Sequence, residues 1–197
     1  MFPETIETDR LRLEPRWPEH VDLGECYRIC SSDPGIDEVT EHVTWEPHET
    51  IRETEEFLRR GRERWDDREA AEYVIRPRES EDGADEIAGF TGFDVDWETG
   101  TATLGVWLRK RFWGRGYSGE RAAALVRVAF EELDLDIVAV SHHPDNEQSR
   151  RAVEGYVDRL GGRREGRLRN TLEFVDGSVH DEVRYTISQA EWRAAVE

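Results

Sequence analysis

The segment from Trp107 to Phe130 constrains the fold more than any other, because an apolar strand leads through a glycine-rich loop into a helix. Its middle, residues 114–119, reads GRGYSG and satisfies the G-x-G-x-x-G pattern of dinucleotide-binding turns. Beyond the loop, apolar residues share one helical face: Ala122, Leu125, Val126, Ala129 and Leu133. The segment therefore predicts a strand–loop–helix unit whose loop approaches a phosphate at the helix N-terminus.

The spacing around the loop does not suit a Rossmann fold. The strand ends near Leu108 or Arg109, and a bulky Phe-Trp pair separates it from the first glycine, Gly114. The next apolar strand ends at residues 141–143 in Ser-His-His, without the carboxylate that holds a ribose in dinucleotide-binding proteins. Two interpretations stay open: a backbone cradle for an anion, or a turn whose basic residues offset neighbouring carboxylates. Those basic residues are Arg109, Lys110, Arg111 and Arg115.

The pattern along the chain predicts one α/β domain over residues 1–197, with mixed strand pairing. Strands are expected at residues 6–15, 70–77, 86–97, 99–109 and 136–143, with a closing hairpin at 163–175 and 179–188. Helices are expected at residues 18–32, 48–67, 144–162 and 189–197, besides the one after the glycine loop. A loop is expected between the first two helices.

The charge of the chain is strongly acidic, with 45 acidic and 27 basic residues and a net charge of -18. Lys110 is the only lysine. Dispersed carboxylates with so little lysine are typical of halophilic proteins; the alternative is a moderately acidic enzyme from an arginine-favouring genome. Either way, bulk charge opposes binding to nucleic acid or to an anionic membrane, so neither is an expected partner.

The two cysteines, Cys26 and Cys30, lie one helical turn apart and are expected to be free thiols. No further metal ligands cluster near them, so no metal site is predicted. The N-terminal residues lack an apolar signal core, and no apolar run reaches membrane-spanning length. The expected location is cytoplasmic.

The loop residues resemble the acyl-CoA motif of the GCN5-related N-acetyltransferases, Gln/Arg-x-x-Gly-x-Gly/Ala, which Arg111, Gly114 and Gly116 match. Further stretches in matching order resemble the RimJ/RimL-type branch, which acetylates N-termini of ribosomal proteins. These stretches are TDRLRLEP, VTWEP, LGVWL, the Asn146-x-x-Ser149-Arg150 motif and HDEVRYTIS, and they span nearly the whole chain.

The resemblance implies a mostly antiparallel sheet of about seven strands, splayed between its fourth and fifth strands and flanked by helices. It also implies acetyl-CoA as cosubstrate: the pantetheine arm would pair with strand-four backbone, and the pyrophosphate would rest on the loop N–H groups. The residues expected to bind the cofactor are Val106, Trp107, Leu108, Arg109, Arg111, Phe112, Trp113, Gly114, Arg115, Gly116, Tyr117, Ser118, Asn146 and Ser149.

The catalytic residues that the resemblance implies are Ser149 and Asn146. The tyrosine that many family members place seven residues after the asparagine is Val153 here. Ser149 is therefore the candidate general acid for the departing thiolate, and Asn146 the candidate ligand of a pantetheine amide. The alternative for both side chains is to satisfy backbone donors at the start of a helix.

The general base is not assigned by the sequence. The glutamate that the branch often carries two residues before the strand-four glycine is Thr103 here. The remaining candidates are a water relay or one of Glu41, His42, Asp94, Asp96, His142 and His143. The paired glycines Gly161 and Gly162 also end their helix about four residues later than in the family, which would be one extra turn in the wall of the acceptor site.

The expected function is transfer of an acetyl group to an amine, with a protein N-terminal amine as the favoured acceptor. A small-molecule amine is an alternative acceptor with the same chemistry. A different class of function, a non-catalytic acyl-CoA-binding module, fits the missing tyrosine and the threonine at position 103. A homodimer is compatible with the sequence.

Overall fold

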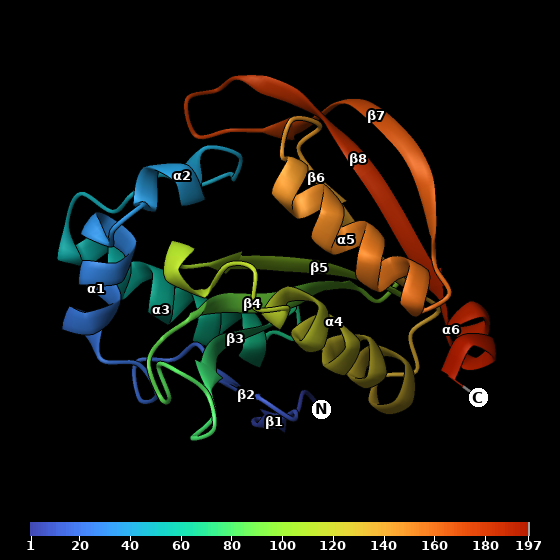
Figure 1. Ribbon diagram of the computed structural model, residues 1–197, viewed down its shortest axis with the longest axis horizontal. Coiled ribbons are helices and arrows are strands. Elements are labelled where there is room, and N and C mark those ends of the chain that lie inside the picture. Colours follow the sequence, from blue (N-terminus) through green and yellow to red (C-terminus); the bar gives the residue numbers. More distant parts are fainter. Residues whose placement is uncertain (197) are drawn as a thin grey trace.

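The chain is built around an eight-stranded sheet in the order β1-β2-β3-β4-β5-β6-β8-β7, seen in the computed structural model, which describes residues 1–196 (Figure 1). The strands are β1 (Ile6–Glu7), β2 (Leu11–Pro15), β3 (Ala70–Pro77), β4 (Gly89–Asp96), β5 (Thr101–Leu108), β6 (Ile137–His142), β7 (Arg163–Glu173) and β8 (Val179–Ser188). Neighbouring strands are antiparallel except β5 and β6, which are parallel.

Helices cover both faces of this sheet. They are α1 (Leu23–Ser32), α2 (Ile36–Thr40), α3 (Ile51–Asp66), α4 (Tyr117–Arg127), α5 (Glu147–Arg159) and α6 (Gln189–Val196), with a short 3₁₀ turn at Lys110–Phe112 and a π turn at Val128–Glu132. The helices α1 and α3 lie on one face, and α4 and α5 on the other (Figure 1). Among residues 1–196, none of the helices is long and apolar enough to cross a membrane.

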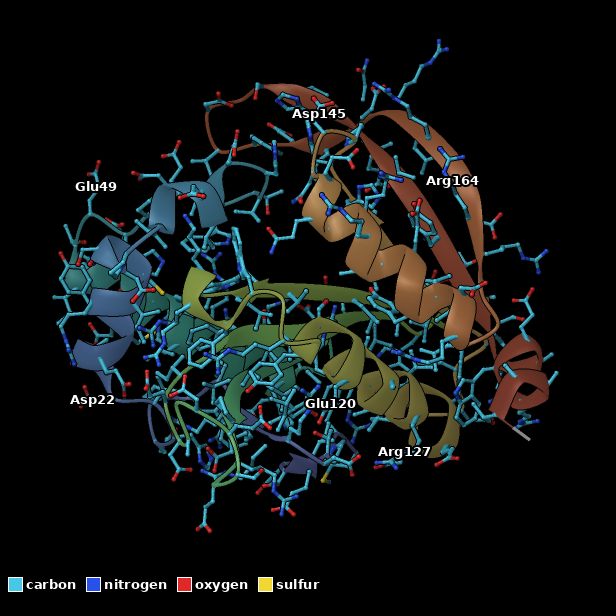
Figure 2. The ribbon with its side chains drawn as sticks, viewed as in Figure 1. Asp22, Glu49, Glu120, Arg127, Asp145 and Arg164 are labelled. Atoms are coloured by element: carbon cyan, nitrogen blue, oxygen red, sulfur yellow. The ribbon has the colours of Figure 1, made fainter. Side chains whose placement is uncertain are left out.

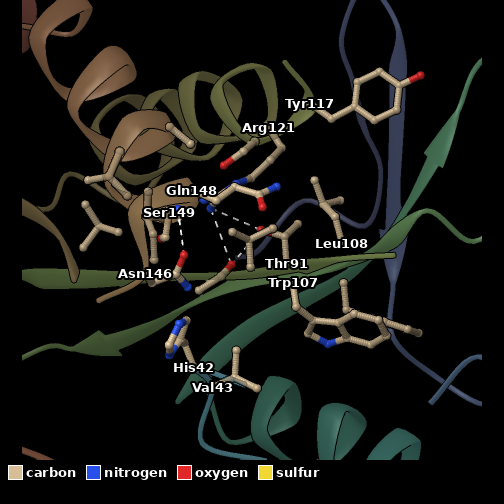
Figure 3. A pocket seen from close by; sticks show the side chains of 18 of the residues that line it. His42, Val43, Thr91, Trp107, Leu108, Tyr117, Arg121, Asn146, Gln148 and Ser149 are labelled. Atoms are coloured by element: carbon tan, nitrogen blue, oxygen red, sulfur yellow. Dashed lines mark hydrogen bonds between the residues drawn. The ribbon is translucent and has the colours of Figure 1, made fainter. Parts of the chain in front are cut away.

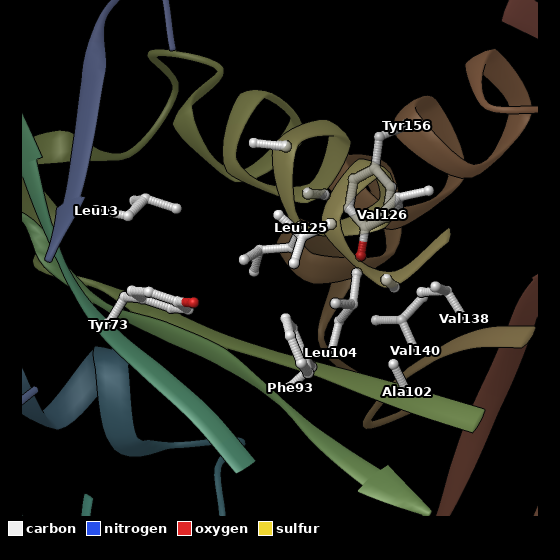
Figure 4. Packing of buried hydrophobic residues seen from close by; sticks show 14 of the residues in the cluster. Leu13, Tyr73, Phe93, Ala102, Leu104, Leu125, Val126, Val138, Val140 and Tyr156 are labelled. Atoms are coloured by element: carbon white, nitrogen blue, oxygen red, sulfur yellow. The ribbon is translucent and has the colours of Figure 1, made fainter. Parts of the chain in front are cut away.

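The main core lies between the sheet and α4. Leu125 is fully buried, and it packs in one cluster with Leu104 of β5 and Tyr73 of β3 (Figure 4). A smaller cluster under α1 and α3 contains Cys26 and Cys30, which are buried free thiols as predicted. The apolar stripe predicted for α4 is thus the surface that fixes this helix against the sheet, and the glycine loop at its start is fixed with it.

Two local structures differ from the expectation. The first strand is split into β1 and β2 by a turn in which the Thr8 hydroxyl accepts from Leu11 N–H, so the sheet has one more strand than expected. The region between the first two helices contains α2, which begins after Gly35 at φ 86°. Its Ile36 and Val39 are buried one turn apart, and this spacing explains why a helix forms in place of the expected loop.

The strands β5 and β6 separate part-way along their length, as the resemblance predicted. They pair only from Thr101–Ile137 to Leu104–Val140. Beyond that point β5 stays paired with β4 as far as Leu108, and β6 stays paired with β8 as far as His142. Each strand keeps its outer neighbour and loses its inner one, so the sheet opens into a V.

Candidate functional site

The V between β5 and β6 opens into a cleft of about 1,210 Å³, large enough for a cofactor-sized ligand. One wall is the free edge of β5, Val106–Leu108. The opposite wall is the start of α5, with Asn146 and Ser149. Figure 3 shows these walls with His42 and Val43 entering from the loop after α2.

The glycine loop forms one end of the cleft and presents unpaired backbone donors. Gly114 and Gly116 have φ of 75° and 81°, and α4 begins at Tyr117. The backbone N–H groups from Gly114 through Ser118 donate no hydrogen bond to any acceptor within residues 1–196. Consecutive free N–H groups at a helix N-terminus form an anion site, because the helix dipole adds to their partial positive charge.

The basic residues of the loop are not part of the cleft lining. Arg109 pairs with Asp33 through Nη2 and Oδ1 at 2.7 Å. Arg111 pairs with Glu86, and Arg115 with Asp82. These three arginines were expected to contact the cofactor, but the neighbouring carboxylates neutralise them. The structure therefore places the other predicted cofactor residues along the cleft and these three outside it.

The two residues at the start of α5 differ in how they are used. Asn146 caps the helix, since its Oδ1 accepts from the Ser149 N–H at 2.9 Å. The Ser149 hydroxyl forms no hydrogen bond within the described chain and lines the cleft, half-buried. Capping therefore accounts for the Asn146 oxygen, while the Ser149 hydroxyl remains free for a ligand.

The candidates for the general base separate into two groups. Glu41, His42 and Asp94 line the cleft. The other three do not: Asp96 caps the β4–β5 turn through the N–H groups of Glu98 and Thr99, and His142 and His143 are buried behind the cleft wall. The candidates for the general base within the cleft lining are therefore Glu41, His42 and Asp94.

A pair of stacked imidazoles joins the loop after α2 to the end of β6. The rings of His42, after α2, and His143, after β6, lie 5.0 Å apart and 6° from parallel. His143 also contacts His180 of β8, with Nε2 and Nδ1 3.2 Å apart. Burial lowers the pKa of His143, and the neighbouring His42 imidazole lowers it further. Both effects favour the neutral form of the His143 imidazole.

The side of the cleft that faces α3 is aromatic. The ring of Trp45 lies 4.9 Å from that of Trp107, and Phe90 lies 5.2 Å from Trp107. Between these rings and the cleft mouth, Gly105 leaves the floor open, since a Cβ there would meet no atom within 4 Å. Aromatic rings therefore line this side of the cleft.

The sequence analysis missed two buried residues of the cleft, Arg121 on α4 and Tyr156 on α5. A signal for Arg121 was present, because it falls four residues after Tyr117 and four before Leu125, on the apolar stripe. A charged residue at such a position is unusual in a core-facing helix.

The comparison with protein families decides the identity. A family model described as an acetyltransferase (GNAT) domain matches residues 10–156. The chain belongs to the GNAT acetyltransferase family. The predicted family and the predicted enzyme class, an N-acetyltransferase, are therefore confirmed.

Individual relatives are also described as N-acetyltransferases. Bacillus subtilis "Putative ribosomal N-acetyltransferase YdaF" is 38% identical over 91 residues, which cover 46% of this chain and about half, 47%, of that relative. Bacillus licheniformis "Uncharacterized N-acetyltransferase p20" is 26% identical over 192 residues, which cover 96% of this chain and 98% of the relative.

Solved structures share the fold of this GNAT enzyme over nearly its whole length. A "putative acetyltransferase" from T. thermophilus has a TM-score of 0.75 at 31% identity, covering 99% of this chain and 94% of that one. The microcin C7 self-immunity acetyltransferase MccE, solved in complex with acetyl-CoA and AMP, has a TM-score of 0.77 at 19% identity, with 95% and 97% covered.

The imidazole bridge predicts a pH-dependent stability. His143 has a lowered pKa in the folded state, so its contribution is present above the ordinary histidine pKa of about 6.5 and is lost as pH falls through the lower folded value. In urea titrations, the free energy of unfolding should be lower at pH 5.5 than at pH 8. This difference between the two pH values should be smaller in His143→Gln. An identical pH slope in both proteins would contradict this account.

Proposed function

We propose that this GNAT enzyme transfers an acetyl group from acetyl-CoA to a primary amine, and that a protein N-terminal amine is its acceptor. The observation that carries the proposal is the cleft in the V between β5 and β6. A row of free N–H groups in the glycine loop bounds one end of this cleft. The proposal takes residues 1–197 as one catalytic domain.

The chain offers two sets of backbone groups for the CoA donor. The N–H groups of Gly114–Ser118 suit the pyrophosphate, because they are free and lie at the helix N-terminus. The free edge of β5 at Val106–Leu108 suits the pantetheine amides, which would add to the sheet as a short strand. The similar fold of MccE, which was solved with acetyl-CoA, supports this assignment.

The proposed reaction is direct attack of the neutral amine on the thioester carbonyl carbon. The carbon–nitrogen bond forms, the carbon–sulfur bond breaks, a base accepts the amine proton, and an acid protonates the thiolate. The free hydroxyl of Ser149 is the proposed acid. The base is proposed among Glu41, His42 and Asp94 of the cleft lining, or a water that one of them holds.

The charge of the cleft mouth suits a cationic acceptor. Glu41, Asp94, Asp145 and Glu147 line the cleft; Asp94 and Glu147 are paired with Arg64 and Arg150, whereas Glu41 and Asp145 have no arginine or lysine within ion-pair distance in residues 1–196. Other acidic residues, such as Asp22 and Glu49, are spread over distant elements (Figure 2). An acidic rim raises the local concentration of an ammonium group. The description of YdaF as a ribosomal N-acetyltransferase supports a protein N-terminus; a small-molecule amine remains the alternative acceptor.

Other properties belong to this proposal as expectations. The excess of carboxylates supports a halophilic protein. A cytoplasmic location is part of the proposal. No nucleic acid, membrane or metal is proposed as a partner. A non-catalytic acyl-CoA-binding role is the alternative if no amine is acylated. A homodimer stays an expectation from the sequence.

Gly114 and Gly177 form a matched pair for testing the loop. Their φ values are 75° and 80°, and a Cβ at either would meet nothing within 4 Å, but only Gly114 lines the cleft. Valine at either position should cost a similar backbone strain, about 1–2 kcal/mol of unfolding free energy. By calorimetry, Gly114→Val should weaken CoA binding at least about tenfold, because its side chain enters the anion site. Equal CoA affinity in both variants would reject the loop assignment.

Ser149→Ala tests the general acid. If its hydroxyl protonates the thiolate, kcat should fall by about 10²-fold while the Kd for CoA changes little. Ser141→Ala is the matched control, because Ser141 lines the same cleft from β6 and should change kcat by less than about threefold. A kcat for Ser149→Ala within that range would exclude the proposed role.

A further inference from the structure

Arg121 is a buried cation without a carboxylate. Its side chain is 1% exposed, and no acidic group lies within ion-pair distance of it in the described chain. Its Nη1 makes only two long hydrogen bonds, to Thr91 Oγ1 at 3.3 Å and to the Gly105 carbonyl at 3.4 Å, and its Nε has no partner. By contrast, buried Arg16 is paired with Glu72. Burying an unpaired charge costs free energy. The folded chain therefore leaves the Arg121 guanidinium without the anionic partner that would offset this cost.

A second unpaired donor lies beside it. Tyr156 of α5 is 1% exposed, and its hydroxyl proton has no acceptor within residues 1–196, although the Arg121 guanidinium, itself a donor, acts on the phenol oxygen. The guanidinium carbon of Arg121 is 5.8 Å from the centre of the Tyr156 ring. Figure 4 shows the Tyr156 hydroxyl directed toward Leu104 and Val140, at the closed end of the V. Burial raises the pKa of Tyr156, which keeps the hydroxyl protonated and able to donate.

Both donors line the same cleft as the glycine loop, and Arg121 lies one helical turn after Tyr117, the first residue of α4. The Gly105 carbonyl that Arg121 contacts lies three residues before the end of β5, about 10 Å along the strand. If CoA lies as proposed, its phosphates are at the loop, its neutral pantetheine follows Val106–Leu108, and its acyl group reaches Arg121 and Tyr156. An acetyl group carries no charge to pair with the guanidinium.

We propose that the closed end of the cleft binds the terminal carboxylate of a short dicarboxylic acyl group, so that thioesters such as succinyl-CoA serve as acyl donors besides acetyl-CoA. This inference rests on the proposed acyl transfer. The carboxylate oxygens accept hydrogen bonds from the Arg121 guanidinium and the Tyr156 hydroxyl, which pairs both groups at once. The bonds made and broken are those of acetyl transfer, the carboxylate is unchanged, and the product amide carries a negative charge in place of the ammonium.

The test is the ratio of kcat/KM for succinyl-CoA to that for acetyl-CoA with one amine. The wild-type ratio should be at least about one. Arg121→Met replaces the buried ion by an apolar chain of similar length, a change that cores often tolerate, and should lower the ratio about tenfold or more. Tyr156→Phe should lower it about threefold to tenfold, and Arg121→Lys should keep most of it.

Several outcomes would overturn the proposal. One is wild-type protein that uses acetyl-CoA but not succinyl-CoA. Another is a parallel loss with both donors in Arg121→Met, which would mean that Arg121 only holds the Gly105 carbonyl in place. If Arg121→Met fails to fold, the wild-type ratio and Tyr156→Phe decide. Failure of acyl transfer itself is recognised separately, because neither thioester would then be consumed with any amine.

Discussion

The separation of β5 from β6 after Leu104 and Val140 is the constraint on which the rest of the site depends. A parallel pair that continued would satisfy both strand edges and close the sheet. Because each strand stays paired with its outer neighbour, the V is held open without loss of the fold. The free edge of β5, the glycine loop and the start of α5 all face the space that this separation creates.

Few positively charged or N–H groups in the cleft are left free to bind an anionic ligand. The chain carries a net charge of -18, and its carboxylates neutralise the arginines beside the glycine loop. Anion binding there falls to the backbone N–H groups of Gly114–Ser118, which donate to no side chain within residues 1–196. Arg121 is the exception, because it is buried in the cleft lining without a carboxylate partner in residues 1–196. Two separate positive sites thus face one channel.

Much of this arrangement could be predicted from the sequence, because local patterns carry it. The stripe through Leu125 set α4, and strand patterns matched β3 and β8 residue for residue. The short helix α2 was missed, since its two buried residues are too few for a periodic signal. The partners of Arg109, Arg111 and Arg115 are carboxylates from two other parts of the chain, which only folding brings near. For the same reason, the isolation of Arg121 is visible only in three dimensions.

The central claim is that the cleft joins an acyl-CoA thioester to an amine. The most direct measurement mixes the protein, at high salt, with acetyl-CoA and a panel of N-terminal peptides and small amines, and follows release of the CoA thiol. The account predicts protein-dependent release of one thiol for each acylated amine, which mass spectrometry confirms. Binding of acetyl-CoA with no thiol released by any amine would contradict it and leave a binding module in place of an enzyme.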